Sequence, residues 1–428
     1  WIVCIVVDVK ERVKSFLLKS AFLVLNLGDV AMYIKFKNKI NIILGRLNVS
    51  QKSLKIFDNR VIDFLDEISI EIKRSKSART FSDLQAFGFW CRKANINRLS
   101  KNYTRNELML GRGTVLHITP SNVPMNFAYS YMFGILSGNN NIVRLPSRKF
   151  VQINILNKII SKILKKAKYS IIKEKTCFIR YEKSDEISNY LSKDMDARLI
   201  WGGDTTINHF KSFDTSPRCI DLTFPDRYSI SIVNLDKVFR LRKEEIKNLA
   251  NKFYNDCYLM DQQGCSSPQA IFWIGKKNIN AKKIFWDHLG KIVDYKYDND
   301  LSITNKKITS LTRAAIESEI DFNLDYKNFK LIKLKINDLS KKIENLRCHF
   351  GTFTEVDIKN LKELENIITK KFQTITYFGI KPDINENFIL TNNIVGVDRL
   401  VPIGRAFDIG PIWDGYDIIY SLSRIISK

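Results

Sequence analysis

The sequence predicts an α/β protein built on a parallel, Rossmann-like sheet. Short apolar runs alternate with amphipathic stretches whose apolar residues recur at helical spacing, and this alternation continues through both halves of the chain. Repeated strand–helix–strand units of this kind favour parallel strands joined by right-handed crossovers. The chain has 428 residues, of which 45% are apolar, so it can bury a large core and should divide into two or more domains.

The elements of the first half are expected in a regular order. A helical lead-in comes first: one helix has an apolar stripe from Val61 to Ile72, and a second is capped at Ser82-Asp83. After it, strands and helices alternate. We expect strands at 113–118, 141–145, 176–181 and 198–201, and helices at 126–137, 147–166, 185–192 and 205–212.

A second α/β domain is expected to begin with the strand at 228–233. A helix follows at 244–260, with apolar residues at helical spacing, and the run 270–274 has the pattern of a buried strand. The polar stretch 294–307 is expected to be an insertion or a surface loop within this domain. A further strand is expected around 372–374.

The charge is strongly positive, because 69 Lys and Arg outnumber 45 Asp and Glu and leave a formal net charge of +24. Such an excess can indicate nucleic acid or an anionic surface. Here the lysines are spread along the chain and form no long basic arm, so we expect most of them to be solvated surface residues and expect no specific nucleic-acid partner. The remaining excess favours an anionic ligand that carries several phosphates.

Other sequence patterns bear on the location of the protein, on membrane insertion and on metal binding. Lys19 and Asp29 interrupt the most apolar stretch, so no membrane span is expected. The seven cysteines form no CxxC pair or regular framework and no signal peptide is evident, which favours a reducing cytoplasm. Cys348 and His349 are adjacent, and because neighbours on a strand point to opposite faces, no zinc site is expected.

Cys265 is the strongest candidate for a catalytic residue. It lies in a polar, turn-prone segment between the expected helix 244–260 and the strand 270–274. Loops held between rigid elements often carry catalytic residues, and a nucleophilic cysteine needs solvent access and nearby donors. The alternative is a small buried cysteine in a turn, which is what most free cysteines are.

Several sequence blocks, in this order, resemble the acyl-CoA reductase (LuxC) family, a branch of the aldehyde dehydrogenase superfamily. The resemblance runs from about residue 64 to the C-terminus, and its specificity comes from the order and spacing of the blocks rather than from any one of them. The matching segments are HITPSNVP at 117–124, GNNNIVRLPS at 138–147, IWGGD at 200–204, QQGCSSPQ at 262–269, RLVPIGRA at 399–406 and WDG at 413–415.

This resemblance implies a fold and a division of the chain. The fold would be aldehyde-dehydrogenase-like: a Rossmann-like cofactor domain and an α/β catalytic domain with the nucleophilic cysteine between them. We expect the helical lead-in and dinucleotide-binding domain at 32–235, the catalytic domain at 236–395, and a C-terminal segment, 396–428, that packs back on both. Residues 1–31 precede the first methionine, Met32, do not match the family, and are left unassigned as a segment that need not be native.

The resemblance also implies the activity, which is reduction of a long-chain acyl-CoA or acyl-protein thioester to a fatty aldehyde. Cys265 would be the nucleophile that holds the acyl group. Asn122, with the backbone N–H of the nucleophile, would form the oxyanion hole, where one lost donor typically costs about 3 kcal/mol of barrier. The alternative for Asn122 is a turn former or helix N-cap before Pro124.

Cofactor contacts follow from the same resemblance. Thr119 and Pro120 fall in the loop after the first strand, and Gly202 and Gly203 would let backbone approach the pyrophosphate or the nicotinamide end. Many relatives that use NAD have Lys at position 144 and Glu at position 147. This chain has Arg144, Ser147 and Arg148, which would accept a 2′-phosphate and favour NADPH, with NADH as the alternative. The alternatives are ordinary solvated charges and a plain glycine turn.

The chain departs from aldehyde-oxidising relatives at the general base. The best-matched position for their glutamate is Thr223, which favours reduction or acyl exchange over hydrolysis, although Asp221 or Asp226 would supply a base if the register shifts. His117 and His209 are expected to be structural.

Two other functions stay open. One is a cysteine acyltransferase or thioesterase that needs no nicotinamide cofactor, and the other is an inactive, basic binding protein. Cofactor binding separates the reductase from both. The family also implies an acyl-protein synthetase or transferase as partner, and we allow for a homo-oligomer.

Overall fold

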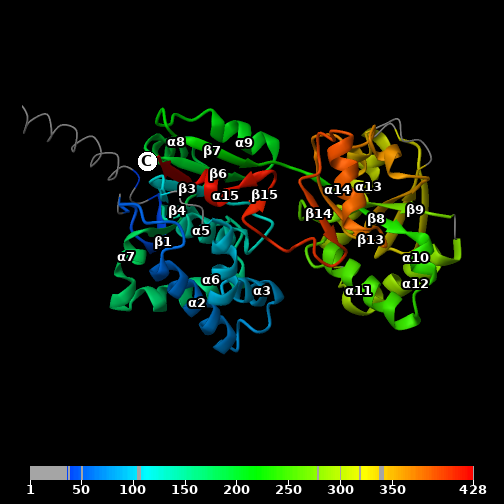
Figure 1. The fold of residues 1–428 in the computed structure, drawn as a ribbon, viewed down its shortest axis with the longest axis horizontal. Helices are drawn as coiled ribbons and strands as arrows, with labels where there is room; N and C mark the ends of the chain where they lie inside the picture. The colour runs from blue at the N-terminus through cyan, green and yellow to red at the C-terminus, as the bar shows by residue number, and fades with distance from the viewer. Residues whose placement is uncertain are drawn as a thin grey trace, which may run out of the picture. The chain divides into compact units, whose positions relative to one another are not determined.

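The computed structural model describes residues 36, 39–49, 52–103, 108–276, 279–298, 300–317, 320–336 and 342–427, which form two compact units (Figure 1). Unit 1 contains the described residues up to Ile200, then Asn208–Asp221 and the chain from Leu422 onward. Unit 2 contains Trp201–Ile207 and Leu222–Ser421. The predicted domain limits at 235 and 395 stay predictions, and the segment 1–31 lies outside the described residues.

Unit 1 is built on a six-stranded sheet in the order β1-β5-β4-β3-β6-β7. The pairs β3–β4, β4–β5 and β3–β6 are parallel, while β1 is antiparallel to β5. The strands are β1 Asn41–Gly45, β3 Thr114–Ile118, β4 Asn140–Arg144, β5 Thr176–Arg180, β6 Ala197–Trp201 and β7 Ile220–Phe224. Strands β3 and β4 are almost wholly buried, as expected for parallel strands covered on both faces.

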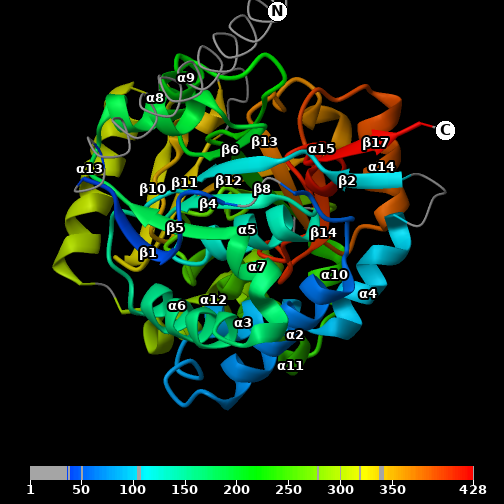
Figure 2. The same ribbon diagram turned by 90° about the vertical axis from the view of Figure 1, so that its left-hand side faces the viewer.

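Helices α2, α3 and α6 pack together on one side of this sheet (Figure 2). The apolar stripe of α2 is buried there, because its residues recur at helical spacing. The helices of this part of the chain are α2 Asn59–Arg74, α3 Ser82–Trp90, α4 Lys93–Ser100, α5 Asn126–Leu136, α6 Val151–Leu164, α7 Ser170–Glu174, α8 Asp185–Lys193 and α9 Asp204–Lys211. A two-stranded ribbon joins β2 Leu108–Gly111 to β17 Ser423–Ile426 near the end of the chain.

Unit 2 contains a seven-stranded sheet in the order β10-β11-β12-β9-β8-β13-β14, parallel except for the β10–β11 hairpin. Its strands are β8 Tyr228–Asn234, β9 Pro268–Ile274, β10 Asn323–Asn328, β11 Leu331–Lys335, β12 Thr352–Ile358, β13 Phe372–Phe378 and β14 Arg399–Pro402. Alternate residues of β9 enter two different apolar clusters: Ala270 and Phe272 join one, and Ile271 and Trp273 join the other. The two faces of the sheet are therefore both covered.

The helices of unit 2 connect these strands. They are α10 Leu235–Phe239, α11 Lys243–Tyr258, α12 Ile279–Lys296, α13 Leu301–Glu317, α14 Pro382–Thr391 and α15 Ile418–Ser421, and a short hairpin joins β15 Ile412–Trp413 to β16 Tyr416–Asp417. Helices α11 and α12 pack against each other. Among the described residues, no helix has both the length and the apolar character that a membrane span requires.

The predicted strand and helix order is confirmed, with two local corrections. The helix predicted from residue 147 begins at Val151, because the chain first bends at Ser147 and Arg148. The polar stretch 294–307, predicted as a loop or insertion, is mostly helical and belongs to α12 and α13. Its Lys307 is fully buried, and Nζ donates to the carbonyl oxygens of Phe329 and Phe350, so this polar residue ties α13 into the unit.

Candidate active site

Cys265 lies in the loop between α11 and β9 of unit 2, as the sequence predicted for this segment. The loop begins with Asp261 and Gln262 in left-handed conformations, at φ values of 52° and 56°, which non-glycine residues seldom adopt. Gly264 then passes close to the ring of Phe407, where a Cβ would lie 2.7 Å from Cε1. A side chain directly before the cysteine would therefore require the Phe407 ring or the loop to shift.

Gln262 fixes the loop by binding the segment 349–352. Its Oε1 accepts from the backbone N–H groups of Gly351 and Thr352 at 2.7 and 3.1 Å. Its Nε2 donates to the carbonyl oxygens of Pro268 and Thr352 at 2.9 and 3.2 Å. The side chain is fully buried, so all four bonds are shielded from water. The Nδ1 of His349 lies 2.8 Å from the carbonyl oxygen of Gln262, and burial lowers the pKa of His349 to about 4, which keeps the ring neutral.

The thiol of Cys265 is placed against the turn that precedes β8. Its Sγ lies 3.9 Å from the carbonyl oxygen of Pro225, and its own carbonyl oxygen accepts from Ser229 Oγ at 2.6 Å. Burial raises the pKa of the thiol to about 11, and the negative charge of Asp414 raises it further. The backbone N–H of Arg227 and the charge of Arg347 act in the opposite direction. The thiolate is thus disfavoured in this form of the protein, and attack on a substrate needs a proton acceptor.

Charged side chains surround this turn. Arg227 donates to the Asp398 carboxylate at 2.5 Å, and Arg347 binds Asp226 and the carbonyl oxygen of Arg227. Asp226, one of the two predicted alternative bases, is therefore held by an arginine. Asp221, the other, belongs to unit 1, where both of its oxygens accept from Arg198 at 2.7 Å. Both carboxylates are engaged in ion pairs. That Thr223 stands where aldehyde-oxidising relatives have their glutamate base stays a prediction.

Asp414 is a residue of this site to which the sequence assigned no chemistry. Its side chain is only 3% exposed, and burial raises the pKa of its carboxyl to about 6. It accepts from Gln373 Nε2 on β13 and lies 3.8 Å from Arg227 Nη1. The available signal was its place in the Trp413-Asp414-Gly415 block, but nothing in the sequence indicates that the charge of Asp414 acts on the Cys265 thiol.

The predicted cofactor residues of unit 1 gather at the carboxyl ends of β3 and β4. Thr119 Oγ1 donates to the carbonyl oxygen of Arg144 at 2.6 Å, so the two loops are joined, and Pro120 follows directly. The guanidinium of Arg144 stacks over Tyr181 at 4.2 Å from the ring centroid. Ser147 and Arg148 are exposed. The carboxyl edge of a parallel sheet is where ligands of open α/β folds bind.

Arg180 belongs to the same edge, and sequence reasoning missed it. It ends β5, and its Nε donates to the carbonyl oxygen of Pro146 at 3.2 Å, next to Ser147. Its Nη2 is buried and has no hydrogen-bond partner among the described residues. A buried guanidinium nitrogen without an acceptor is unusual, since such groups are nearly always bonded. An anionic group bound beside Ser147 would supply that acceptor.

Asn122 lies in the exposed loop between β3 and α5. The N-cap of α5 is Met125, and no side chain caps that helix, so the cap alternative for Asn122 is excluded. Because Asn122 belongs to unit 1 and Cys265 to unit 2, their joint role as an oxyanion hole stays a prediction.

Gly202 and Gly203 connect β6 to α9, as predicted. The N–H of Gly202 donates to the carbonyl oxygen of Phe224 at 3.2 Å, while a Cβ at Gly203 would meet nothing within 4 Å. Asp204 is in the first turn of α9, where a carboxylate is unfavourable for a phosphate group. Which end of a cofactor this turn contacts, the pyrophosphate or the nicotinamide, stays a prediction.

Both histidines for which we predicted structural roles have protein partners. His117 is fully buried in β3, with Nδ1 2.8 Å from Ser130 Oγ and Nε2 3.0 Å from Asn141 Oδ1. His209 pairs with Asp185 at 2.9 Å. Over the described ranges, no three His, Cys, Asp or Glu residues come together as a group that could hold a metal ion.

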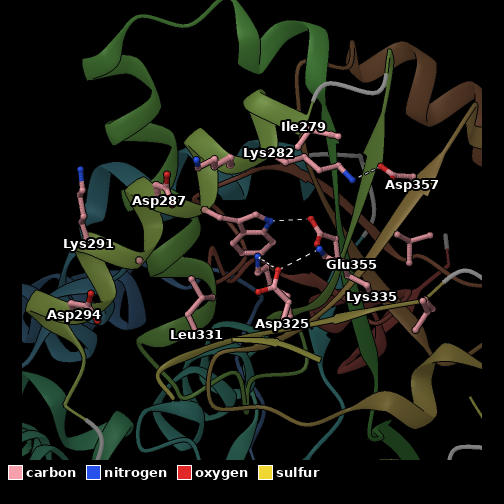
Figure 3. A pocket seen from close by; sticks show the side chains of 16 residues that line it. Ile279, Lys282, Asp287, Lys291, Asp294, Asp325, Leu331, Lys335, Glu355 and Asp357 are labelled. Atoms are coloured by element: carbon pink, nitrogen blue, oxygen red, sulfur yellow. Dashed lines mark hydrogen bonds and ion pairs between the residues drawn. The ribbon is translucent and has the colours of Figure 1, made fainter. Parts of the chain in front are cut away.

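A pocket of about 920 Å³ lies elsewhere in unit 2, between α12 and the strands β10, β11 and β12 (Figure 3). The buried carboxylate of Glu355 on its wall accepts from the indole N–H groups of Trp273 and Trp286 at 2.7 and 3.0 Å. Lys282 and Asp357 form an ion pair at its rim. None of the predicted site residues lines this pocket, so size alone does not locate the chemistry, and the cysteine loop stays the candidate active site.

Comparisons with known proteins identify the family and the fold. A model of the family described as acyl-CoA reductase (LuxC) matches residues 91–427. A long-chain acyl-protein thioester reductase from Aliivibrio fischeri is 29% identical over 326 residues, which are 74% of this chain and 64% of that protein. Another, from Photobacterium leiognathi, is 28% identical over 184 residues, 42% of this chain and 35% of that protein. The chain thus spans less than two thirds of the length of either relative.

Solved structures resemble the fold at low sequence identity. Aldehyde dehydrogenase 21 from Physcomitrella patens has a TM-score of 0.59 at 15% identity, covering 86% of this chain and 85% of that one. Glyceraldehyde-3-phosphate dehydrogenase GapN from Methanocaldococcus jannaschii, complexed with NADP, has a TM-score of 0.57 at 15% identity, covering 86% and 90%. The predicted aldehyde-dehydrogenase-like fold is therefore confirmed. Since the family match covers most of its length, the chain belongs to the acyl-CoA reductase (LuxC) family.

Proposed function

We propose that the protein reduces a long-chain acyl thioester, on CoA or on a carrier protein, to a fatty aldehyde with NADPH and through an acyl group held on Cys265. The observation that carries the proposal is the position of Cys265. The thiol lies on a loop fixed by Gln262, against a turn whose Arg227 N–H can donate to the sulfur anion. Relatives named as long-chain acyl-protein thioester reductases support the substrate class.

The carboxyl edge of the unit 1 sheet fits a phosphorylated dinucleotide. Arg148 is exposed beside Ser147, and Arg180 directs a nitrogen without an acceptor to the same edge. A carboxylate at position 147 would repel a 2′-phosphate, whereas a serine hydroxyl and two guanidinium groups would bind it. When bound, the nicotinamide supplies the hydride. Thr119, Pro120, Arg144, Gly202 and Gly203 complete the proposed cofactor contacts, and NADH stays the alternative.

The chain's own residues have distinct roles in this proposal. Cys265 Sγ attacks the acyl carbon and displaces the thiol of CoA or of the carrier. Asn122 and the Cys265 N–H stabilise the negative charge on the acyl oxygen, which is where a donor contributes most. With threonine at position 223, the acyl-enzyme lacks the base that would activate water, so it persists until it is reduced.

The test is consumption of NADPH with tetradecanoyl-CoA as substrate, using the full chain, with Cys265→Ala alongside. We expect aldehyde to form in proportion to NADPH oxidised, and only when Cys265 is present. NADPH binding to the Cys265→Ala variant, monitored by fluorescence, checks that the variant is folded. Transfer of a radiolabelled acyl group to Cys265 without any cofactor use would instead favour the acyltransferase, and no acyl transfer at all would contradict the proposal.

Other features of the family remain proposals for this chain. The excess positive charge suits a substrate with several phosphates or an acidic carrier. An acyl-protein synthetase or transferase partner, self-association and a cytoplasmic location would each be tested on the purified full chain or in cells.

A further inference from the structure

Asp414 is held in a way that differs from the other carboxylates near Cys265. It lies in the turn between β15 and β16, in a left-handed conformation at φ 48°, with its side chain 3% exposed. Its Oδ1 accepts from Gln373 Nε2 on the buried strand β13. Arg227 forms a longer ion pair with Asp414, at 3.8 Å from Nη1, and a closer one with Asp398, at 2.5 Å. Asp414 therefore shares this arginine with Asp398 and is not its closest partner.

A chain of hydrogen bonds joins Asp414 to the cysteine loop. Besides donating to Asp414, Gln373 accepts at Oε1 from Thr374 Oγ1 at 3.2 Å. The N–H of Thr374 donates to Ser229 Oγ at 3.2 Å, and this hydroxyl donates to the carbonyl oxygen of Cys265 at 2.6 Å. The network ends at the backbone of Cys265 and links the Asp414 turn to the cysteine loop. Among the charges that act on the thiol, that of Asp414 has the largest effect.

The carboxyl of Asp414 can change its protonation near neutral pH. Burial raises its pKa to about 6, which the Gln373 amide and the Arg227 charge oppose. The charge of Asp398 raises this pKa further, and that of Arg399 lowers it. A group whose pKa lies near the working pH can both accept and donate a proton during turnover. Asp226 is less suited, since its side chain is 49% exposed and bonded to Arg347, whereas that of Asp414 is 3% exposed.

We propose that Asp414 is the acid–base group that exchanges the proton of Cys265, directly or through one water molecule. The inference rests on the proposed thioester reduction. As Sγ attacks the acyl carbon, the thiol proton passes to the Asp414 carboxylate. When the bond to the departing sulfur breaks, that proton goes to the leaving thiolate, so acyl transfer from one sulfur to the other consumes no proton.

The reductive half needs one proton from solvent. Hydride adds to the acyl carbon, and the electron pair of the carbonyl bond moves to oxygen. When the carbonyl re-forms, the bond between carbon and Sγ breaks and the aldehyde leaves. Asp414, protonated from solvent, then returns a proton to Sγ and restores the thiol. Each turnover thus consumes one hydride and one proton, which balances reduction of a thioester to an aldehyde and a thiol.

The decisive variant is Asp414→Asn, because the proposal predicts opposite effects on two reactions of the same sulfur. Removing the negative charge lowers the thiol pKa, so alkylation of Cys265 by iodoacetamide at neutral pH should become roughly 3- to 10-fold faster. Acylation by radiolabelled tetradecanoyl-CoA, measured without cofactor, should become about 100-fold slower, the usual scale for a lost acid–base group. A distorted site would slow both reactions.

The matched control is Asp408→Asn. Asp408 is an exposed carboxylate on the same C-terminal segment, paired with Arg405 at 2.6 Å, and both rates should stay at the wild-type value. A second variant, Gln373→Met, removes the amide that holds the Asp414 pKa down. The acidic limb of the acylation rate should then move to higher pH, because the carboxylate is lost sooner as the pH falls.

The outcomes separate this role from the proposed function. Wild-type protein that forms no acyl-enzyme overturns both. Wild-type protein that is acylated, with an Asp414→Asn variant acylated within twofold of its rate, overturns the role of Asp414 alone. Parallel loss of alkylation and acylation in Asp414→Asn, with an unshifted pH profile in Gln373→Met, makes Asp414 a structural residue and likewise overturns it.

Discussion

The side chain of Gln262 exchanges two hydrogen bonds with the backbone of Thr352. Nε2 donates to the Thr352 carbonyl oxygen at 3.2 Å, and Oε1 accepts from the Thr352 N–H at 3.1 Å. At the start of β12, the Gln262 side chain thus forms the pair of backbone hydrogen bonds that a neighbouring strand would otherwise form. It joins the cysteine loop to this part of the sheet although 90 residues separate the two positions.

The first prediction concerns this pairing. Gln262→Leu should lower the free energy of unfolding by about 3 kcal/mol, because it leaves the N–H groups of Gly351 and Thr352 buried without an acceptor. The shift of the urea midpoint measures the effect, with unfolding monitored by the fluorescence of Trp273 and Trp286. Gln263→Leu, at the half-buried neighbouring position, is the control and should shift the midpoint far less. Equal shifts in the two variants would contradict the role given to Gln262.

The second prediction concerns the reactivity of Cys265. Burial raises the pKa of its thiol to about 11, so the thiolate fraction in the free protein should rise about tenfold per pH unit from pH 7 towards pH 10. Alkylation by iodoacetamide, mapped to Cys265 by mass spectrometry, should follow that slope. A rate that reaches its plateau below pH 8 would show that the free protein already holds a thiolate. Cys265→Ala identifies labelling at other cysteines.

The third prediction concerns stability against pH. Burial lowers the pKa of His117 to about 4, whereas an unfolded histidine titrates near 6.5. The unfolded chain therefore binds the proton first, and about 3 kcal/mol of stability should be lost as the pH falls from about 6.5 to 4. His117→Gln should flatten this part of the profile, while His209→Gln, at an exposed position on α9, should leave it unchanged. Unfolding midpoints measured across this range decide the matter.

The fourth prediction concerns cofactor choice. Arg180→Met should weaken NADPH binding about 10- to 100-fold, the cost of one or two charge-assisted hydrogen bonds to phosphate, and should leave NADH binding almost unchanged. Fluorescence titration of the full chain with each cofactor gives the two dissociation constants. Arg92→Met, which removes an exposed guanidinium stacked over Phe89, is the control. An equal loss of affinity for both cofactors would show that Arg180 does not bind the 2′-phosphate.

The sequence by itself determined the order of strands and helices and the family, and it singled out Cys265 as the candidate nucleophile. Periodicity is a local property, and β3, β4, β8 and β9 appear where their apolar runs predict them. It failed at residues 294–307, because Lys307 is polar yet buried, with its charge offset by two backbone carbonyl groups far along the chain.

Only the tertiary structure decided which side chains meet. Arg180 reaches Pro146 because β4 and β5 are neighbours in the sheet, and Asp414 meets Gln373 across 41 residues. The pKa of the Asp414 carboxyl follows from that meeting, because burial and nearby charges shift a pKa only where folding has brought them together. A sequence pattern records which residue types are present, whereas burial and long-range pairing depend on the packing of the whole unit.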